Sequence, residues 1–460
     1  MLASTCEPAA AKPATFFGSV PVRFRQKSAG VRLSIIVLAA FAIRLVLVAC
    51  IFPQTISPKD HFAEFGWEMG WVARSIALGH GFSSPFYPFT GPTALVPPGF
   101  PYLLAGVFRV FGIYTALSAV AILSINSILS ALTCIPLYFS TKNALGVRTA
   151  TFAAWAWAFY PFAIYFSAAR VWDYALTGLL FTTCFWLAQQ LHHQTRLFAW
   201  LGFGLLYGIT ALSNPSVLSL FPIFLVLAAL PIWRRREKWL GRTFTALFAL
   251  LIVLAPWTVR NYRALHTLTP VRDNFWLECW AGNDGNTFES NDRWAHPASN
   301  PAEMQEFQSL GEVRYLARAQ DLAENYIHLH PFLFIQASLH RALCFWTGYW
   351  SFDRAYLDDQ PTEIPNIFFS TALTIWMLIG LRKLWRSDRS TALPYLLLMA
   401  IFPLTYFLTH ASPDYRQPIE PEILALVSAG ILSLKKFAPP KFEQALSTEG
   451  DPLLAASTAV

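Results

Sequence analysis

The chain has 460 residues, of which 55% are hydrophobic and only 13% are charged, which excludes an ordinary soluble domain. The net charge of +7 does not indicate nucleic-acid binding, because the Lys and Arg residues are dispersed between apolar runs and form no basic stripe. Six cysteines lie far apart without CxxC or CxxH spacing, so neither a disulfide framework nor a zinc site is supported.

The N-terminal segment, residues 1–31, is polar and basic and holds a single acid, Glu7. The apolar run that follows is long and shows no obvious cleavage site. These features predict an uncleaved membrane anchor preceded by a cytoplasmic tail, and not a signal peptide that is removed.

Ten apolar runs of about the length that a membrane-spanning helix needs follow along the chain. They predict an all-α protein, a polytopic transmembrane helical bundle embedded in membrane lipid. This bundle occupies residues 32–436, and a second cytoplasmic tail follows at 437–460. The predicted spans are about 32–53, 115–139, 149–168, 172–190, 197–213, 216–233, 241–258, 366–384, 391–409 and 419–435.

Two further apolar segments, 95–112 and 330–350, are interrupted by proline or by charge. We expect both as amphipathic helices at the membrane interface, one in each of the two long outer loops, 54–114 and 259–365.

Positive charge distinguishes the two sides of the predicted bundle. The short loops assigned to the inside hold 12 Lys and Arg residues, whereas the short outer loops hold two, Arg170 and Arg416. This asymmetry predicts that both termini are cytoplasmic and that the protein lies in a cell membrane. By the same assignment, 21 of the 27 Asp and Glu residues lie outside, which predicts a working face on the outer, periplasmic side.

The first outer loop carries two acids, Glu64 and Glu68, that share one face if the segment is helical. Acids next to a membrane are costly unless they face water or perform chemistry. Two interpretations follow. The pair forms the polar face of an interfacial helix, or one of the two acts as a catalytic base.

Three later outer elements also hold unusual polar residues. Asp173 opens a span, where it either complements the helix dipole or contributes to a site. Arg260 and Arg263 leave a span directly, and Tyr415 and Arg416 occupy the last outer turn. Guanidinium groups at this depth bind a lipid phosphate or serve as interfacial anchors.

Motifs of soluble enzymes do not occur. The sequence contains no GxxxxGK[ST], HExxH, GxSxG or GxGxxG, so an ATP-driven pump or an intracellular nucleotide-sugar enzyme has no support.

The order of the remaining motifs resembles the polytopic glycosyltransferases of the GT-C fold. More closely, it resembles the bacterial group related to protein O-mannosyltransferases and to the lipid A aminoarabinose transferase, which is similar to glycosyltransferase family 39. The resemblance covers about residues 32–436. It rests on the acidic first loop with its G-x-G turn, and then on PPGFPYLL, STKNALGVRTA, YPFAIYFSAARVWD, ALSNPS, PWTVRNY with a later AGN, and DYRQPIEP.

The resemblance implies that a polyprenyl-phosphate donor supplies the sugar and that a carboxylate of the first outer loop is the base. Many relatives carry an Asp eight residues before the position of Ala73, where this chain has Phe65. The base is then Glu68, which lies in the motif core, or Glu64. Asp173 matches a second outer acid of this fold.

The chemistry agrees with these residue types. The leaving phosphate needs no acid, whereas the acceptor hydroxyl gains from one base, and a single direct displacement inverts the anomeric carbon. Arg260, Arg263, Arg416 and Tyr415 are the predicted phosphate-binding residues. No cofactor is predicted, and although carboxylates are compatible with a divalent cation, no DxD-like cluster argues for one.

The sugar stays open, and the acceptor is a lipid, a glycan or a protein. One alternative function is a polymerase or ligase of lipid-linked glycans. The other is a membrane transporter or flippase. Transport is disfavoured because the spans show little sign of internal repeats or of paired helices broken by Gly or Pro.

Overall fold

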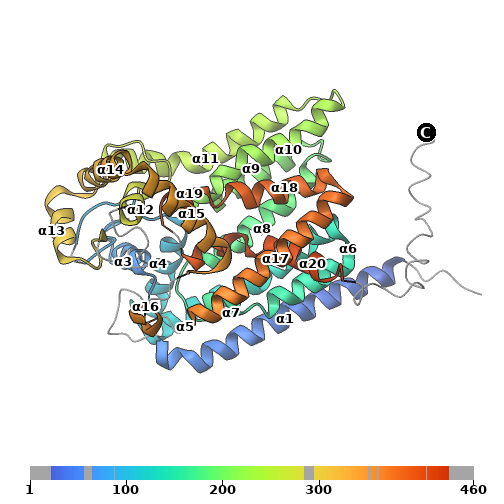
Figure 1. Cartoon of the computed structure of the whole chain (residues 1–460), viewed down its shortest axis with the longest axis horizontal. Coiled ribbons are helices and arrows are strands. Elements are labelled where there is room, and N and C mark those ends of the chain that lie inside the picture. Colours follow the sequence, from blue (N-terminus) through green and yellow to red (C-terminus); the bar gives the residue numbers. More distant parts are fainter. Residues whose placement is uncertain are drawn as a thin grey trace, which may run out of the picture.

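A computed structural model describes residues 22–55, 65–87, 89–283, 295–350, 354–359, 362–410 and 412–434. In these residues the regular structure is helical, and the one pairing of extended backbone is an isolated antiparallel bridge between Ser83 and Pro92. Long helices form a bundle, and shorter helices cap one of its ends, the loop-bearing end (Figure 1). The prediction of an all-α helical bundle is confirmed.

Ten helices coincide with the ten predicted spans. They are α1 (Val22–Thr55), α5 (Ala116–Leu132), α6 (Cys134–Ala158), α8 (Tyr174–Leu191), α9 (Leu197–Ser213), α10 (Phe221–Arg234), α11 (Leu240–Leu265), α17 (Glu363–Ser387), α18 (Arg389–Ile401) and α20 (Glu420–Ile431).

The turn between the second and third spans lies inside α6. Gly146 has a φ of 84° and interrupts the helical backbone there, which glycine tolerates because it has no Cβ. The second span therefore runs past its predicted end at 139. The third helix stops at Ala158, and the short helix α7 (Pro161–Ala168) follows it.

Six stretches of the described residues are long and apolar enough to cross a membrane. They contain seven of the predicted spans, because Ala116–Ala158 holds two of them. The other three, on α8, α9 and α20, do not meet this criterion of length and composition, and neighbouring helices bury much of their surface. The protein is a multi-pass membrane protein.

Small residues allow the bundle helices to pack closely. A Cβ on Gly380 of α17 would lie 1.9 Å from the carbonyl oxygen of Leu426 on α20, and one on Gly204 of α9 would lie 2.1 Å from that of Ala246 on α11. Such contacts are typical of helix packing in membranes, where no hydrophobic effect drives helices together.

The loop-bearing end is built from two long connections and from short turns. Its helices are α3 (Trp67–Ala77), α4 (Gly99–Phe111), α12 (Phe275–Gly282), α13 (Pro301–Leu310), α14 (Glu312–Leu329), α15 (Pro331–Thr347), α16 (Arg354–Asp359), α19 (Leu404–Leu408) and the 3₁₀ segments η1 (Pro215–Leu220) and η3 (Pro413–Ile419). Helices α4 and α15 occupy the two segments predicted to be interfacial. A separate small core that includes Phe86, Leu277 and Phe307 joins the two long connections.

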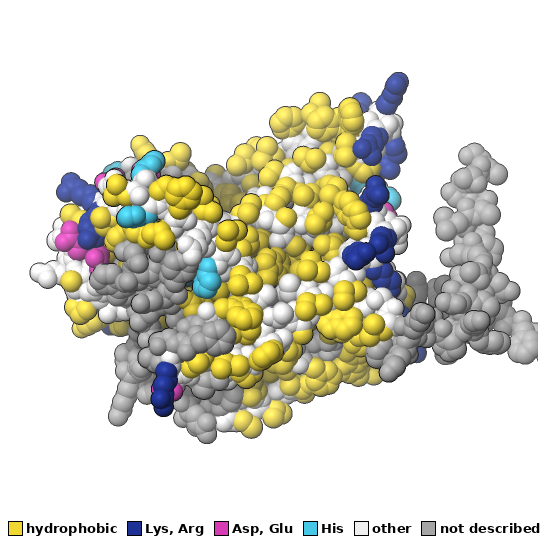
Figure 2. Space-filling view, viewed as in Figure 1, with side chains coloured by type: hydrophobic (Ala, Val, Ile, Leu, Met, Phe, Trp, Pro, Cys, Tyr) yellow, Lys and Arg dark blue, Asp and Glu magenta, His cyan; other side chains and the backbone are white. Residues whose placement is uncertain are grey.

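The two ends of the bundle differ in charge. Exposed Arg and Lys side chains gather at the end opposite the loops (Figure 2), where Arg234, Arg235 and Arg236 follow α10 and where Arg382 and Lys383 end α17. This distribution agrees with the asymmetry counted in the sequence.

Candidate active site

A cavity of about 280 Å³ lies where the loop-bearing end meets the bundle. It is lined by the start of α3, by the connections before α8 and after α9, by α12 and by the segment from α19 to η3. The lining residues are Met69, Pro97, Trp172, Asp173, Tyr174, Asn214, Pro215, Ser216, Arg272, Asn274, Phe275, Glu278, Thr405, Tyr406, Thr409, His410, Tyr415 and Pro418. The cavity therefore joins residues that are separated by almost the whole chain.

Asp173 is a buried acid in the wall of this cavity. It directly precedes α8, so it lies outside that helix, and its side chain makes no capping hydrogen bond to the helix backbone. Its Oδ2 accepts hydrogen bonds from Thr177 Oγ1 at 2.8 Å and from Asn214 Nδ2 at 3.5 Å. Burial raises the pKa of Asp173 to about 6, although Thr177 and the charge of Arg272 oppose the shift. Asp173 can therefore exchange a proton close to neutral pH.

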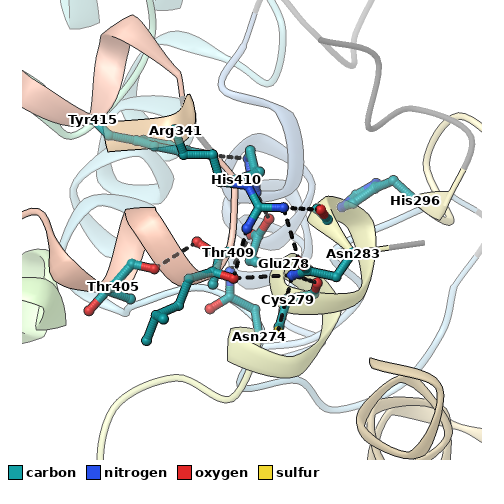
Figure 3. Close-up of polar contacts among 12 residues, drawn as sticks. Asn274, Glu278, Cys279, Asn283, His296, Arg341, Thr405, Thr409, His410 and Tyr415 are labelled. Atoms are coloured by element: carbon teal, nitrogen blue, oxygen red, sulfur yellow. Dashed lines mark hydrogen bonds and ion pairs between the residues drawn. The ribbon is translucent and has the colours of Figure 1, made fainter. Parts of the chain in front are cut away.

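A second acid, Glu278, faces His410 across the cavity wall (Figure 3). Glu278 Oε2 lies 3.4 Å from His410 Nδ1, and Glu278 Oε1 accepts a hydrogen bond of 2.6 Å from Asn274 Nδ2. The hydroxyl of Tyr415 is hydrogen-bonded to His410 Nε2, and the Tyr415 ring stacks on Tyr406 with centroids 4.6 Å apart. Four cavity-lining polar side chains thus form one continuous chain, Asn274–Glu278–His410–Tyr415.

Arg341 of α15 holds together the two backbone segments that carry Glu278 and His410. Its guanidinium is buried and donates to the carbonyl oxygens of Gly282 and Leu408 and to Asn283 Oδ1 (Figure 3). Asn283 Nδ2 in turn donates to Leu408 O at 3.1 Å. The C-terminal end of α12, the helix that carries Glu278, is therefore bonded to the end of α19, and His410 follows shortly after α19.

Glu68, the favoured base from the sequence, lies beside the cavity but is not part of its lining. It occupies the first turn of α3 and is buried, with Oε1 3.4 Å from His296 Nε2. The next residue, Met69, lines the cavity. Gly66 brings the start of α3 close to the segment before Asp173: its φ is 89°, and a Cβ there would lie 2.6 Å from Val171 O. Glu64 lies outside the described residues.

The predicted phosphate-binding arginines do not line the cavity. Arg260 donates to the carbonyl oxygens of Phe82 and Thr93, and its guanidinium lies 5.0 Å from the centroid of the Trp257 ring. Arg416 is buried and bonded to the Glu420 carboxylate. Arg263 is exposed near the end of α11.

The structure thus brings Asp173 and Tyr415 together in one cavity, places Glu68 next to it, and puts the three predicted arginines elsewhere. Sequence reasoning passed over Arg272, Asn274 and Glu278, all of which come from the stretch VRDNFWLECW. The sequence signal that could have indicated these site residues is the occurrence of a basic, an amide and an acidic residue at 272, 274 and 278. Their convergence with His410 depends on the tertiary fold. Among the described residues, no group of three or more His, Cys, Asp or Glu side chains is placed to hold a metal ion.

Comparisons with known proteins identify the fold. The family model described as dolichyl-phosphate-mannose-protein mannosyltransferase matches residues 95–259. Archaeal oligosaccharyltransferase AglB from Archaeoglobus fulgidus, solved in complex with an inhibitory peptide and a dolichol-phosphate, superposes with a TM-score of 0.53 at 15% sequence identity. The match covers 93% of this chain and 53% of AglB, so the chain spans about half the length of that protein. No curated protein sequence matches the chain.

A second solved structure is more distant. ArnT from Cupriavidus metallidurans, bound to undecaprenyl phosphate, superposes with a TM-score of 0.34 at 11% identity, over 86% of this chain and 77% of that one. The family model and the AglB match confirm the predicted resemblance: the chain has the GT-C fold of membrane glycosyltransferases.

Proposed function

We propose that this protein is an integral membrane glycosyltransferase. It moves a single sugar from a polyprenyl-phosphate donor to a hydroxyl of a lipid, glycan or protein acceptor. The observation that carries the proposal is the cavity with Asp173, Arg272 and Glu278 in its wall, within a GT-C bundle. The family model names a dolichyl-phosphate sugar, and AglB was solved with a dolichol-phosphate, which supports a lipid-phosphate donor.

The residues of the site have distinct roles in this proposal. Arg272 stabilises the charge that builds on the departing phosphate, a role that sequence reasoning gave to Arg260, Arg263, Arg416 and Tyr415. One carboxylate takes the proton of the acceptor hydroxyl as that oxygen attacks the anomeric carbon, and the bond from this carbon to the phosphate oxygen breaks, with inversion.

The base is a carboxylate at the wall of the cavity. Glu68 is the candidate from the sequence, and its position next to Met69 supports that role. Asp173 is the second candidate, because it lines the cavity and its raised pKa suits a group that accepts a proton near neutral pH.

The loop-bearing end faces the outer, periplasmic side in this proposal, and both termini are cytoplasmic. The gathering of exposed Arg and Lys at the opposite end supports this orientation. Single cysteines at the exposed positions 89 and 388 test it in a variant without Cys6 and Cys50. A membrane-impermeant thiol reagent applied from outside should label position 89 and leave position 388 unlabelled. Labelling of 388 alone would reverse the orientation.

The alternative function is a polymerase or ligase of lipid-linked glycans, which the similarity to an oligosaccharyltransferase would favour. The size of the cavity distinguishes this alternative from transfer of a single sugar. A volume of about 280 Å³ lies just below the range of small-molecule pockets, roughly 300–1,000 Å³. It supports one sugar residue more than an oligosaccharide.

The experiment measures release of free polyprenyl phosphate by the purified protein in nanodiscs, with acceptor-containing membranes. We expect turnover of undecaprenyl-phosphate monosaccharides and none of an oligosaccharide on undecaprenyl pyrophosphate. Turnover of the pyrophosphate-linked oligosaccharide alone would contradict the proposal in favour of the alternative.

A further inference from the structure

We propose that Glu312, the first residue of α14, is a positioning residue that holds Arg272 in place for the donor phosphate and releases it when Glu312 and Asp273 are both ionised. This inference rests on the proposed function, in which Arg272 stabilises the charge on the departing phosphate. It goes beyond that function because it assigns a role to a buried carboxyl group that does not line the cavity.

The position of Arg272 depends on its backbone. Among the residues that the structure describes, no hydrogen bond or ion pair holds the guanidinium of Arg272, although its charge acts on Asp173 and on Tyr406. The side chain nevertheless lines the cavity. Its place in the cavity wall is therefore set by the main chain from which it projects.

This main chain is fixed on both sides of Arg272. On one side, Val271 O accepts a hydrogen bond of 2.8 Å from Trp257 Nε1. On the other side, Asp273 N donates a hydrogen bond of 3.1 Å to Ala94 O. Arg272 thus lies between two bonded peptide units, and one of them depends on Ala94 in the first long connection.

Glu312 in turn fixes Ala94. Its Oε1 accepts a hydrogen bond of 2.6 Å from Ala94 N. Ala94 is completely buried, so water cannot replace this acceptor, and a buried amide without a partner is costly. The two hydrogen bonds from Glu312 to Ala94 and from Ala94 to Asp273 therefore connect α14 to the backbone next to Arg272.

Charge is a second link between Glu312 and the cavity wall. Glu312 Oε2 and Asp273 Oδ1 are both buried, and neither makes a hydrogen bond to another described residue. Burial raises the pKa of both groups, and the charge of Asp273 raises the pKa of Glu312 further. With one proton the pair is free of like-charge repulsion. With none, the two carboxylates repel each other, which moves Asp273 away from α14 and displaces Arg272.

Other charged groups do not cancel this repulsion. Arg260 of α11 acts on Glu312 with the opposite sign but more weakly than Asp273. The charged side chains on the helices packed against α14 contact other groups: Glu278 contacts His410, Glu303 and Glu306 contact Arg318, His340 contacts Cys344, and Arg341 donates to Leu408 O.

The test measures the affinity of the purified protein in nanodiscs for bare undecaprenyl phosphate, together with its melting temperature. Arg272→Gln should weaken binding about tenfold or more, because the cavity loses its guanidinium. Glu312→Leu removes the acceptor of Ala94 N and should weaken binding by a similar factor. Because Glu312 acts through Arg272, adding Glu312→Leu to Arg272→Gln should weaken binding by less than about twofold more.

Glu363→Leu is the matched control for folding. Glu363 is also a buried acid at the first position of a helix, and its Oε1 accepts a hydrogen bond of 2.7 Å from Tyr349 N, outside the cavity lining. This variant should lower the melting temperature about as much as Glu312→Leu does, and it should leave the affinity for undecaprenyl phosphate unchanged.

Two further variants keep the test decisive if Glu312→Leu does not fold. Trp257→Phe removes the donor to Val271 O, so it should also weaken binding, again with little further effect beside Arg272→Gln. Glu312→Gln keeps an acceptor for Ala94 N and never ionises. Between about pH 7 and about pH 9.5 the affinity of the wild type should fall about threefold or more, and that of Glu312→Gln should fall less. Ionisation of the lipid phosphate affects both proteins alike.

The outcomes distinguish this inference from the proposed function. Unchanged binding in both Glu312→Leu and Trp257→Phe, or effects that are as large with Arg272→Gln as without it, overturns the inference and leaves the glycosyltransferase intact. An equal loss of binding in Glu363→Leu also overturns it, because the loss then follows from lower stability. Identical pH profiles of the wild type and Glu312→Gln overturn the release on ionisation. Undiminished binding by Arg272→Gln contradicts the role of Arg272 in the proposed function itself.

Discussion

Replacing Asp173 by Asn should increase stability and decrease activity, a combination that a structural acid would not give. In the folded protein Asp173 keeps its proton up to about pH 6, because burial raises its pKa from an ordinary value of 3.8. Between these two values the folded state binds more protons than the unfolded chain, so stability falls as pH rises from about 4 to about 6. Above that range, keeping Asp173 ionised costs up to about 3 kcal/mol, since each pKa unit corresponds to about 1.4 kcal/mol.

Asn carries no charge, and its side-chain oxygen can still accept the hydrogen bond from Thr177. At pH 7.5 we therefore expect the apparent melting temperature of Asp173→Asn in detergent to rise by a few degrees, and the difference from wild type to vanish near pH 4. Sugar transfer should fall by about two to four orders of magnitude if Asp173 is the base.

Asp388→Asn is the control for the change in stability. Hydrogen bonds from Thr391 and from the first amides of α18 lower the pKa of Asp388, so the same substitution there should lower the melting temperature slightly. An Asp173→Asn variant that melts lower than wild type and transfers sugar normally would refute the reasoning, because Asp173 would then be an ordinary structural acid.

Three further predictions follow from contacts near the cavity. If Glu68 is the base in place of Asp173, Glu68→Gln should reduce transfer by about two to four orders of magnitude without weakening donor binding, as measured by turnover and by lipid affinity; unchanged turnover would leave Asp173 as the base. Arg260→Lys should lower the melting temperature, because Lys lacks the planar fork whose two nitrogens donate separately to Thr93 O and Phe82 O, whereas Arg263→Lys at an exposed position should not; equal melting of the two variants would contradict this assignment. Burial and the charge of Asp273 raise the pKa of Glu312, so wild-type stability should keep falling as pH rises from about 4.5 through that raised pKa. Glu312→Gln should flatten the profile of melting temperature against pH. An identical profile in this variant would exclude ionisation of Glu312 as the cause.

Much of the fold could be predicted from the sequence because membrane spans are a local signal. Apolar runs of sufficient length must form helices in lipid, since no water satisfies their backbone groups there. The α9 helix, Leu197–Ser213, begins and ends at its predicted residues. The second span runs past its predicted end for an equally local reason: a single glycine, Gly146, makes the turn, and it lies within the connection predicted between residues 139 and 149.

The site was harder to predict because its residues converge from distant parts of the chain. Asp173 was identified because an acid at the start of an apolar run is conspicuous. Glu278 is not conspicuous, because it lies in a loop with many acids, and Arg341 is needed to bring it to His410. The predicted arginines lie outside the cavity lining, and their phosphate-binding role stays a prediction. A guanidinium at the membrane interface is a candidate to bind a lipid phosphate, whereas Arg260 donates hydrogen bonds to two backbone carbonyl oxygens. No spacing in the sequence distinguishes these two roles.

The buried arginines and the acids of the cavity differ in how they are paired. Buried cations are well satisfied: Arg44 donates to Ser130 and to the carbonyls that end α6, and Arg416 is bonded to Glu420. The acids of the cavity lack such partners. Asp173 has two neutral hydrogen-bond donors and no cation within bonding distance among the described residues, and Glu278 faces an imidazole. A fold that neutralises its buried arginines could also have neutralised Asp173. Leaving that carboxylate with a raised pKa in a cavity lowers stability, and sites where local stability is sacrificed are the expected positions of catalytic groups.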